Sequence, residues 1–182
     1  EDVRDAVAGT FLEGAQILSV SSTTGEGFEA FQSVLNDTIS TVEPRSTEGV
    51  FRMPIQRVFS SKGFGTVITG VPVSGKVVVG DSIEVLPLGK TGRVRGVQAY
   101  LADAEKAQAG QSSALNVTDL DYKEVCRGMV ATTPGHFRHA KMVEARLYYL
   151  PINRSPLPHR TRIRFHCGTA EVLGEVFLID TK

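Results

Sequence analysis

Few residues in this chain have the types and the spacing that enzyme chemistry requires. Ser60 and Ser61 lack a nearby base, and the nucleophile motif G-x-S-x-G does not occur. The four histidines and two cysteines are not spaced as the roughly four convergent ligands of a zinc site, which favours solvated histidines over a metal site. The phosphate-cradling loop G-x-x-x-x-G-K-[ST] is also absent. The sequence therefore points to a ligand pocket and predicts no catalytic or metal-ligating residues.

Residues 51–80 are the stretch that must position such a pocket. Phe51, Met53 and Ile55 alternate with polar or exposed positions, which is the pattern of a half-buried strand. A Gly-x-Gly turn follows, and a β-branched run then returns as the next strand. Three further glycines recur at five-residue intervals. Glycines at this spacing allow sharp corners between short strands, which favours a small closed β-barrel.

The remaining periodicity predicts helices before this barrel and strands after it. Two amphipathic helices are expected at 2–12 and 28–39, with a short strand at 16–20. The alanine-rich residues 101–110 fit a helix or a loop equally well. Further strands are expected at 82–86, 93–99, 112–117, 129–131, 143–149, 163–167 and 171–179.

Charge is balanced over the whole chain but unevenly distributed along it. Residues 1–48 carry nine acidic and two basic side chains, whereas residues 138–182 carry eight basic and four acidic ones. This asymmetry indicates an anionic partner for the C-terminal part, with a solvated strand face as the alternative. The apolar runs are far shorter than the roughly 20 residues of a membrane span. With an acidic start and two unpaired cysteines, we expect a cytoplasmic protein without a membrane partner.

The order of several motifs resembles the second domain of translational GTPases. F-R-x-P-I-x-R-V-F, K-G-F-G-T-V-I-T-G and S-G-K-V-V-V-G-D follow one another within residues 51–81. R-V-R-G-V-Q at 93–98 and G-T-A-E-V at 168–172 narrow the resemblance to the selenocysteine-specific elongation factor (SelB) family. The resemblance covers essentially the whole chain.

This resemblance implies a mainly β fold in three parts. Residues 1–46 would be the C-terminal α/β remnant of a GTP-binding domain, and residues 47–136 the domain II β-barrel. Residues 137–182 would begin a truncated domain III barrel. Three strands cannot close a barrel, so an exposed sheet edge and self-association of the fragment are expected.

In this family the middle barrel receives the aminoacyl end and the terminal adenosine of a charged tRNA. A selenol is an anion near neutral pH, and bacterial members surround it with an Asp-Arg pair and a second Arg. Here Gln56 stands in place of the Asp and Ser112 in place of the second Arg, so we expect weaker selectivity. The alternative for Arg57 is a surface arginine on a strand edge. The resemblance assigns to the pocket the residues Gln56, Arg57, Lys62, Gly63, Phe64, Gly65 and Ser112.

The loop V-S-S-T-T-G-E-G at 20–27 resembles the last guanine-recognition loop of the same GTPases. Ser21 and Ser22 would contact the base there, with Ser22 in place of the usual Ala; the alternative is a generic glycine-rich loop. The Asn-Lys-x-Asp motif and the phosphate loop are absent. We therefore expect this chain to need no cofactor and to neither bind nor hydrolyse GTP, although the parent protein would use GTP and Mg²⁺.

The resemblance thus implies a fragment of an elongation factor that delivers aminoacyl-tRNA, here selenocysteinyl-tRNA, to the ribosome in a GTP-dependent way. Aminoacyl-tRNA and the ribosome would be the partners of the parent protein. One alternative is another translational GTPase, of the elongation factor Tu or initiation-factor gamma type. A second alternative is a protein-interaction barrel that binds no tRNA.

Overall fold

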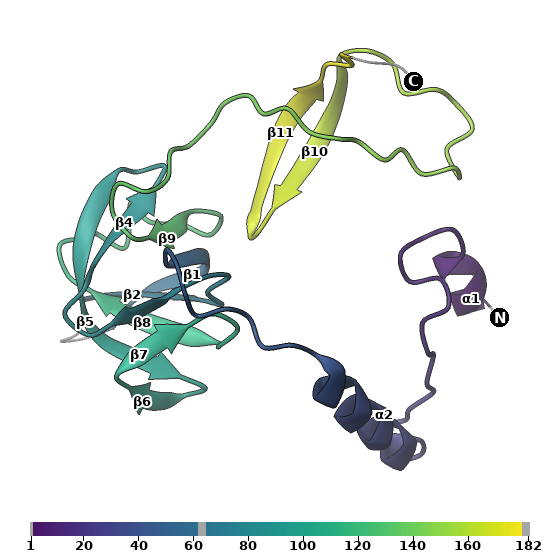
Figure 1. Ribbon diagram of the computed structural model, residues 1–182, viewed down its shortest axis with the longest axis horizontal. Helices are drawn as coiled ribbons and strands as arrows, with labels where there is room; N and C mark the ends of the chain where they lie inside the picture. The colour runs from purple at the N-terminus through teal and green to yellow at the C-terminus, as the bar shows by residue number, and fades with distance from the viewer. Residues whose placement is uncertain (1, 62–64, 180–182) are drawn as a thin grey trace. The chain divides into compact units, whose positions relative to one another are not determined.

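The computed structural model describes residues 2–61 and 65–179. The chain divides into two units, and Figure 1 labels their helices and strands. The first unit comprises Glu1–Glu43 and Glu144–His159, and the second comprises Pro44–Val143 and Arg160–Lys182. The mainly β fold class is confirmed. The three domain boundaries expected from the sequence stay a prediction. None of the described helices is long and apolar enough to cross a membrane.

The first unit contains helices α1 (Asp2–Val7) and α2 (Phe28–Thr41). Helix α1 is shorter than predicted, because Gly9 takes a left-handed conformation with φ 72° soon after it. Helix α2 is confirmed, and its apolar face includes an edge-to-face pair of Phe28 and Phe31 with ring centroids 6.4 Å apart. The strand predicted at 16–20 is wrong. No described strand pairs with this stretch, and a strand requires a hydrogen-bonded neighbour.

The second unit contains a closed barrel of six antiparallel strands. Its order is β4-β9-β1-β2-β8-β5, and β5 pairs with β4 to close the circle. Short β6 (Ala102–Ala104) extends β5, and β3 (Lys76–Val78) pairs separately with β7 (Lys106–Gln108). The barrel strands are β1 (Arg52–Ser61), β2 (Gly65–Gly70), β4 (Ser82–Leu86), β5 (Lys90–Ala99), β8 (Ser113–Val117) and β9 (Val130–Thr132).

The core of the barrel follows the alternation that the sequence predicts. Phe51, Met53 and Ile55 are all buried, and they pack in one cluster with Ile68 and Leu115. Burial of large aliphatic and aromatic side chains is the main stabilising contribution in such a small barrel. The expected strands at 82–86, 93–99, 112–117 and 129–131 are confirmed within a few residues.

A β-bulge in β1 interrupts this alternation. Ile55 lies opposite Gly70 and Arg57 lies opposite Thr69, so Gln56 is the extra residue. The bulge shifts the inward position by one, and Val58 rather than Arg57 faces buried Ile68. Arg57 is therefore on the outer face of the barrel and exposed.

The sequence fits either a helix or a loop at residues 101–110. In the structure these residues form mainly short strands. Tyr100 and Leu101 form the turn that connects β5 to β6, and their φ angles are 52° and 68°. Two consecutive residues with positive φ define a tight hairpin turn that normally contains glycine or asparagine. The sequence offers neither residue here, so the hairpin was not predictable from turn chemistry.

The C-terminal part forms one hairpin of β10 (Thr161–Cys167) and β11 (Ala170–Val176). The strands predicted at 163–167 and 171–179 are thus confirmed in position, although β11 ends at Val176. The strand predicted at 143–149 is wrong: no described strand offers it a partner, and alternation alone does not make a strand. Phe165 and Val172 lie opposite each other, and their side chains are 46% and 54% exposed.

We expect this chain to self-associate through the exposed apolar face of the β10–β11 hairpin. Sedimentation velocity should show concentration-dependent association, because an uncovered apolar strand face favours pairing with a second copy. The variants Phe165→Ser and Val172→Ser should reduce association, whereas Phe11→Ser, at an exposed position in the first unit, should not. An unmodified chain that remains monomeric at high concentration would contradict this expectation.

Candidate functional site

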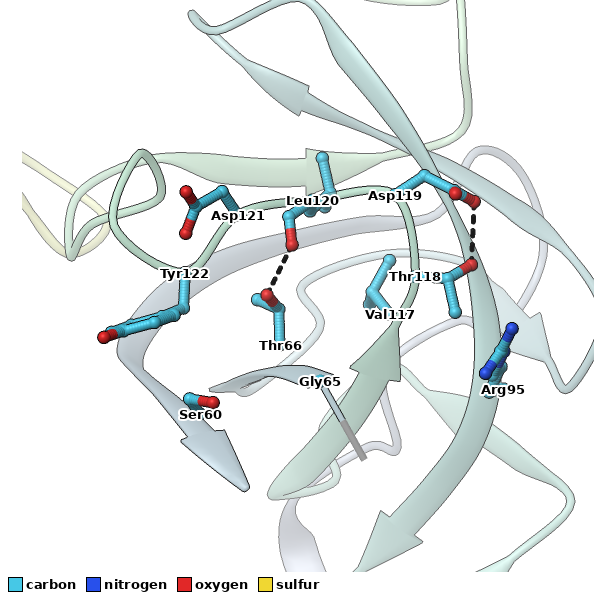
Figure 2. Close-up of a pocket in the computed structure, with 10 residues that line it drawn as sticks. All are labelled: Ser60, Gly65, Thr66, Arg95, Val117, Thr118, Asp119, Leu120, Asp121 and Tyr122. Atoms are coloured by element: carbon cyan, nitrogen blue, oxygen red, sulfur yellow. Dashed lines mark hydrogen bonds between the residues drawn. The ribbon is translucent and has the colours of Figure 1, made fainter. Parts of the chain in front are cut away.

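A hollow of about 350 Å³ lies at the end of the barrel where β1 and β2 meet (Figure 2). It is formed by the end of β1, the start of β2, the end of β8, the loop that follows β8, and one residue of β5. Its lining residues are Ser60, Gly65, Thr66, Arg95, Val117, Thr118, Asp119, Leu120, Asp121 and Tyr122.

The loop that follows β8 is held against the barrel by buried contacts. Buried Thr66 donates its hydroxyl hydrogen to the carbonyl oxygen of Leu120 at 2.5 Å. Leu120 and Val125 are themselves buried and belong to the core cluster. Within the loop, Asp121 accepts a hydrogen bond from the N–H of Lys123 at 2.9 Å. The floor of the hollow is therefore a fixed surface that needs little ordering when a ligand binds.

The hollow combines one cation, two carboxylates and one aromatic ring (Figure 2). Arg95 is the extra residue of a bulge in β5 and has no ion pair with any residue that the structure describes. Asp119 and Asp121 each use one oxygen in a local hydrogen bond and keep the other without a partner in the described ranges. Tyr122 is 42% exposed, so its ring remains accessible.

The structure places the predicted pocket residues in two groups. Gly65 lines the hollow, whereas Gln56, Arg57 and Ser112 do not. Gly65 pairs with Ser61, four residues along β1 from Arg57, which corresponds to about 13 Å. Predicted residues Lys62, Gly63 and Phe64 lie outside the described residues.

Arg57 and Ser112 lie at the same end of the sheet formed by β1, β2 and β8. Arg57 is opposite Thr69, and Thr69 is opposite Ala114, two residues after Ser112. Two strand spacings separate β1 from β8 by about 10 Å. Both side chains are exposed, so an arginine at position 112 would be within reach of a ligand held by Arg57.

Sequence reasoning missed most residues of the hollow. Arg95 lies within the motif R-V-R-G-V-Q, which indicates the family and does not by itself indicate a ligand. The run Asp119-Leu120-Asp121-Tyr122 directly follows a strand and combines carboxylates with an aromatic ring. Polar and aromatic residues that follow barrel strands were the available signal, because loops at the strand ends line binding sites.

The loop at 20–27 is tightly hydrogen-bonded within itself. The N–H of Ser21 donates to the carbonyl of Glu26 at 3.0 Å, and the N–H of Gly25 donates to the carbonyl of Ser21 at 2.9 Å. Thr24 N–H donates to the Ser21 hydroxyl at 3.2 Å. These bonds occupy N–H groups that a phosphate cradle would need, so the loop does not fit a triphosphate with Mg²⁺. The N–H of Ser22 donates no hydrogen bond to any residue that the structure describes.

Two ion pairs of the β10–β11 hairpin bear on ligand binding. In strand β10, Arg164 pairs with Glu171 at 2.8 Å and Arg162 with Glu175 at 3.9 Å, which partly neutralises the basic strand. These pairs are exposed and contribute little stability. Within residues 2–61 and 65–179, no group of three or more His, Cys, Asp or Glu side chains is arranged to hold a metal ion.

The barrel belongs to the class of translation-factor second domains, because residues 65–132 match the family model of elongation factor Tu domain 2. The chain is also 38% identical over 180 residues to the selenocysteine-specific elongation factor of Desulfomicrobium baculatum, covering 99% of this chain and 28% of that protein. It therefore belongs to the selenocysteine-specific elongation factor family, as the sequence motifs predicted.

Solved structures agree with this assignment. The elongation factor SelB of Methanococcus maripaludis in complex with the GTP analogue GPPNHP is 26% identical, with a TM-score of 0.80 over 96% of this chain and 39% of that chain. A bacterial selenocysteine-specific elongation factor is 29% identical, with a TM-score of 0.76 over 93% of this chain and 29% of that chain. The chain thus spans less than half the length of each of these relatives.

Proposed function

We propose that this barrel binds the aminoacylated 3′ end of a tRNA, with the terminal nucleoside in the hollow beside Gly65 and the aminoacyl group near Arg57. The observation that carries the proposal is the composition of the hollow on a barrel of this class. A cation, two carboxylates and an exposed aromatic ring are complementary to the three parts of a nucleotide.

Each part of a nucleotide has a matching group. A base stacks on the ring of Tyr122, and such stacking typically contributes about 1–3 kcal/mol per base. Ribose hydroxyls donate to the unpartnered oxygens of Asp119 and Asp121. Arg95 offers two or more N–H donors to a phosphate, as charge-assisted hydrogen bonds. The carboxylates also disfavour a phosphate on their own side, which sets the direction of the ligand.

We extend this proposal to a longer protein of the kind that the relatives represent. There the barrel would take part in GTP-dependent delivery of aminoacyl-tRNA, selenocysteinyl-tRNA in this family, to the ribosome in the cytoplasm. Family membership and the GTP-analogue complex of the Methanococcus maripaludis relative support this role. The competing candidate is a barrel that binds protein rather than tRNA, and salt dependence separates the two.

Equilibrium binding of aminoacyl-tRNA to this chain, measured over a series of salt concentrations, tests the proposal. We expect affinity to fall steeply with salt, because phosphate contacts release counterions. Arg95→Glu should weaken binding roughly tenfold or more and make the salt slope shallower by about one unit. Exposed Lys76 in β3 does not line the hollow, so Lys76→Glu is the matched control and should change affinity by less than about threefold.

Two outcomes would contradict the proposed function. One is affinity that does not depend on salt. The other is an equal loss of affinity in Arg95→Glu and Lys76→Glu, which would indicate only a general response to net charge.

A further inference from the structure

The turn of the β10–β11 hairpin is bonded to β1 at the residue that precedes the bulge. The side-chain hydroxyl of Thr169 donates to the main-chain carbonyl oxygen of Ile55 at 2.7 Å, although the two residues are 114 positions apart. The N–H of Gly128 donates to the same oxygen at 3.2 Å. Thr169 belongs to the motif G-T-A-E-V, which the proposed function does not otherwise explain.

Packing around this hydrogen bond is close. Gly168 has φ 60°, and a Cβ atom added there would lie 3.2 Å from the ring of Pro54. A Cβ atom added at Gly128, which has φ 97°, would lie 3.2 Å from the Cα of Ala170. Both glycines thus permit backbone approaches that larger residues would disturb. The hairpin turn is seated against β1 and against the segment before β9.

Both main-chain polar groups of Ile55 form hydrogen bonds with the segment before β9 or with the hairpin turn. Its N–H donates to the carbonyl of Met129 at 2.8 Å, and its carbonyl accepts from Gly128 and Thr169. The next residue is the bulged Gln56, and Arg57 follows it. The three hydrogen bonds therefore fix the last regular position before the bulge. A one-residue shift of the register there would exchange the faces of Gln56 and Arg57.

We propose that Thr169 is a positioning residue that holds the β1 bulge in place and so couples seating of the β10–β11 hairpin to the orientation of Arg57. Its consequence for ligand binding rests on the proposed function of Arg57. The hydroxyl is the part of Thr169 that matters, since without it the carbonyl of Ile55 keeps only the longer bond from Gly128. A change in how the hairpin packs against β1 would then change the aminoacyl pocket, and a ligand in the pocket would change that packing.

Two variants of this chain isolate the hydroxyl. Thr169→Val keeps the shape and removes the donor, whereas Thr169→Ser keeps the donor and removes a methyl group. Amide hydrogen exchange at Ile55 and Gly128 reports on the bulge without any ligand. We expect Thr169→Val to speed exchange at both amides roughly threefold to tenfold, while Thr169→Ser stays close to the original chain and buried Leu115 is unchanged in both.

A double-mutant cycle then tests the coupling to Arg57. Thr169→Val should weaken aminoacyl-tRNA binding roughly threefold to tenfold in the original chain and have no effect in Arg57→Ala. Unchanged exchange at Ile55, equally fast exchange at Leu115, or a Thr169→Ser variant that behaves like Thr169→Val would each overturn the proposal. So would an equal loss of affinity in both Arg57 backgrounds.

If the proposed function is wrong, the binding measurements show a different result. If Arg57→Ala leaves tRNA affinity unchanged, the assignment of Arg57 to the pocket is wrong. The exchange rates at Ile55 and Gly128 then decide by themselves whether Thr169 holds the bulge.

Discussion

Replacing Leu115 with alanine is expected to lower the free energy of unfolding of the second unit by about 2–5 kcal/mol. Leu115 lies in β8, opposite Ile68 of β2 on one side and Val97 of β5 on the other, and its side chain is 0% exposed. Truncation removes buried apolar surface and leaves a cavity that strands bonded on both sides cannot close. Urea unfolding followed by circular dichroism measures the change.

Leu101 provides the matched control for this truncation. Its side chain is 98% exposed in the turn between β5 and β6, so Leu101→Ala should change stability by less than about 0.5 kcal/mol. Equal effects of the two substitutions would show that Leu115 is not part of the barrel core. An altered dependence on urea concentration would instead indicate a change in the surface exposed on unfolding.

The sequence predicted the barrel well where local pattern and tertiary structure coincide. Phe51, Met53 and Ile55 alternate and are all buried. The same alternation continued for one more step would bury Arg57, and the bulge at Gln56 prevents this. A bulge depends on how one strand pairs with its neighbours, so periodicity within β1 contains no sign of it. The resemblance, rather than the pattern, placed Arg57 in a ligand pocket.

The predictions failed elsewhere for the same reason, because strand pairing is not visible in a local sequence pattern. Residues 143–149 alternate as clearly as residues 163–167, yet only the second stretch has a described partner strand and becomes β10. The hollow was similarly missed, because Arg95 and Tyr122 are 27 positions apart and come together only through strand pairing. Gly65 lies at this end of the barrel, and its φ of 79° fits the glycine turn that the sequence indicates locally.

We expect Arg57→Ala to lower the preference for selenocysteinyl-tRNA over seryl-tRNA, by roughly tenfold if Arg57 donates to the selenolate. The selenol is ionised near neutral pH, whereas the serine hydroxyl is neutral, so an exposed cation discriminates between them. Ser112→Arg should raise the preference, since position 112 lies at the same end of the sheet, two strands across and two residues along from Arg57, roughly 12 Å in all. The ratio of the two binding affinities is the quantity to measure.

Charge-matched controls separate this effect from general electrostatics. Lys106→Ala removes a cation and Ser82→Arg adds one, each at an exposed position outside the proposed pocket. Both should shift the two affinities in parallel and leave their ratio unchanged, because tRNA phosphates respond to charge whichever amino acid is attached. The two pocket variants should change the ratio in opposite directions. If Arg57→Ala leaves the ratio where it was, the selenolate is held elsewhere, and Ser112→Arg would then have no neighbouring cation to reinforce.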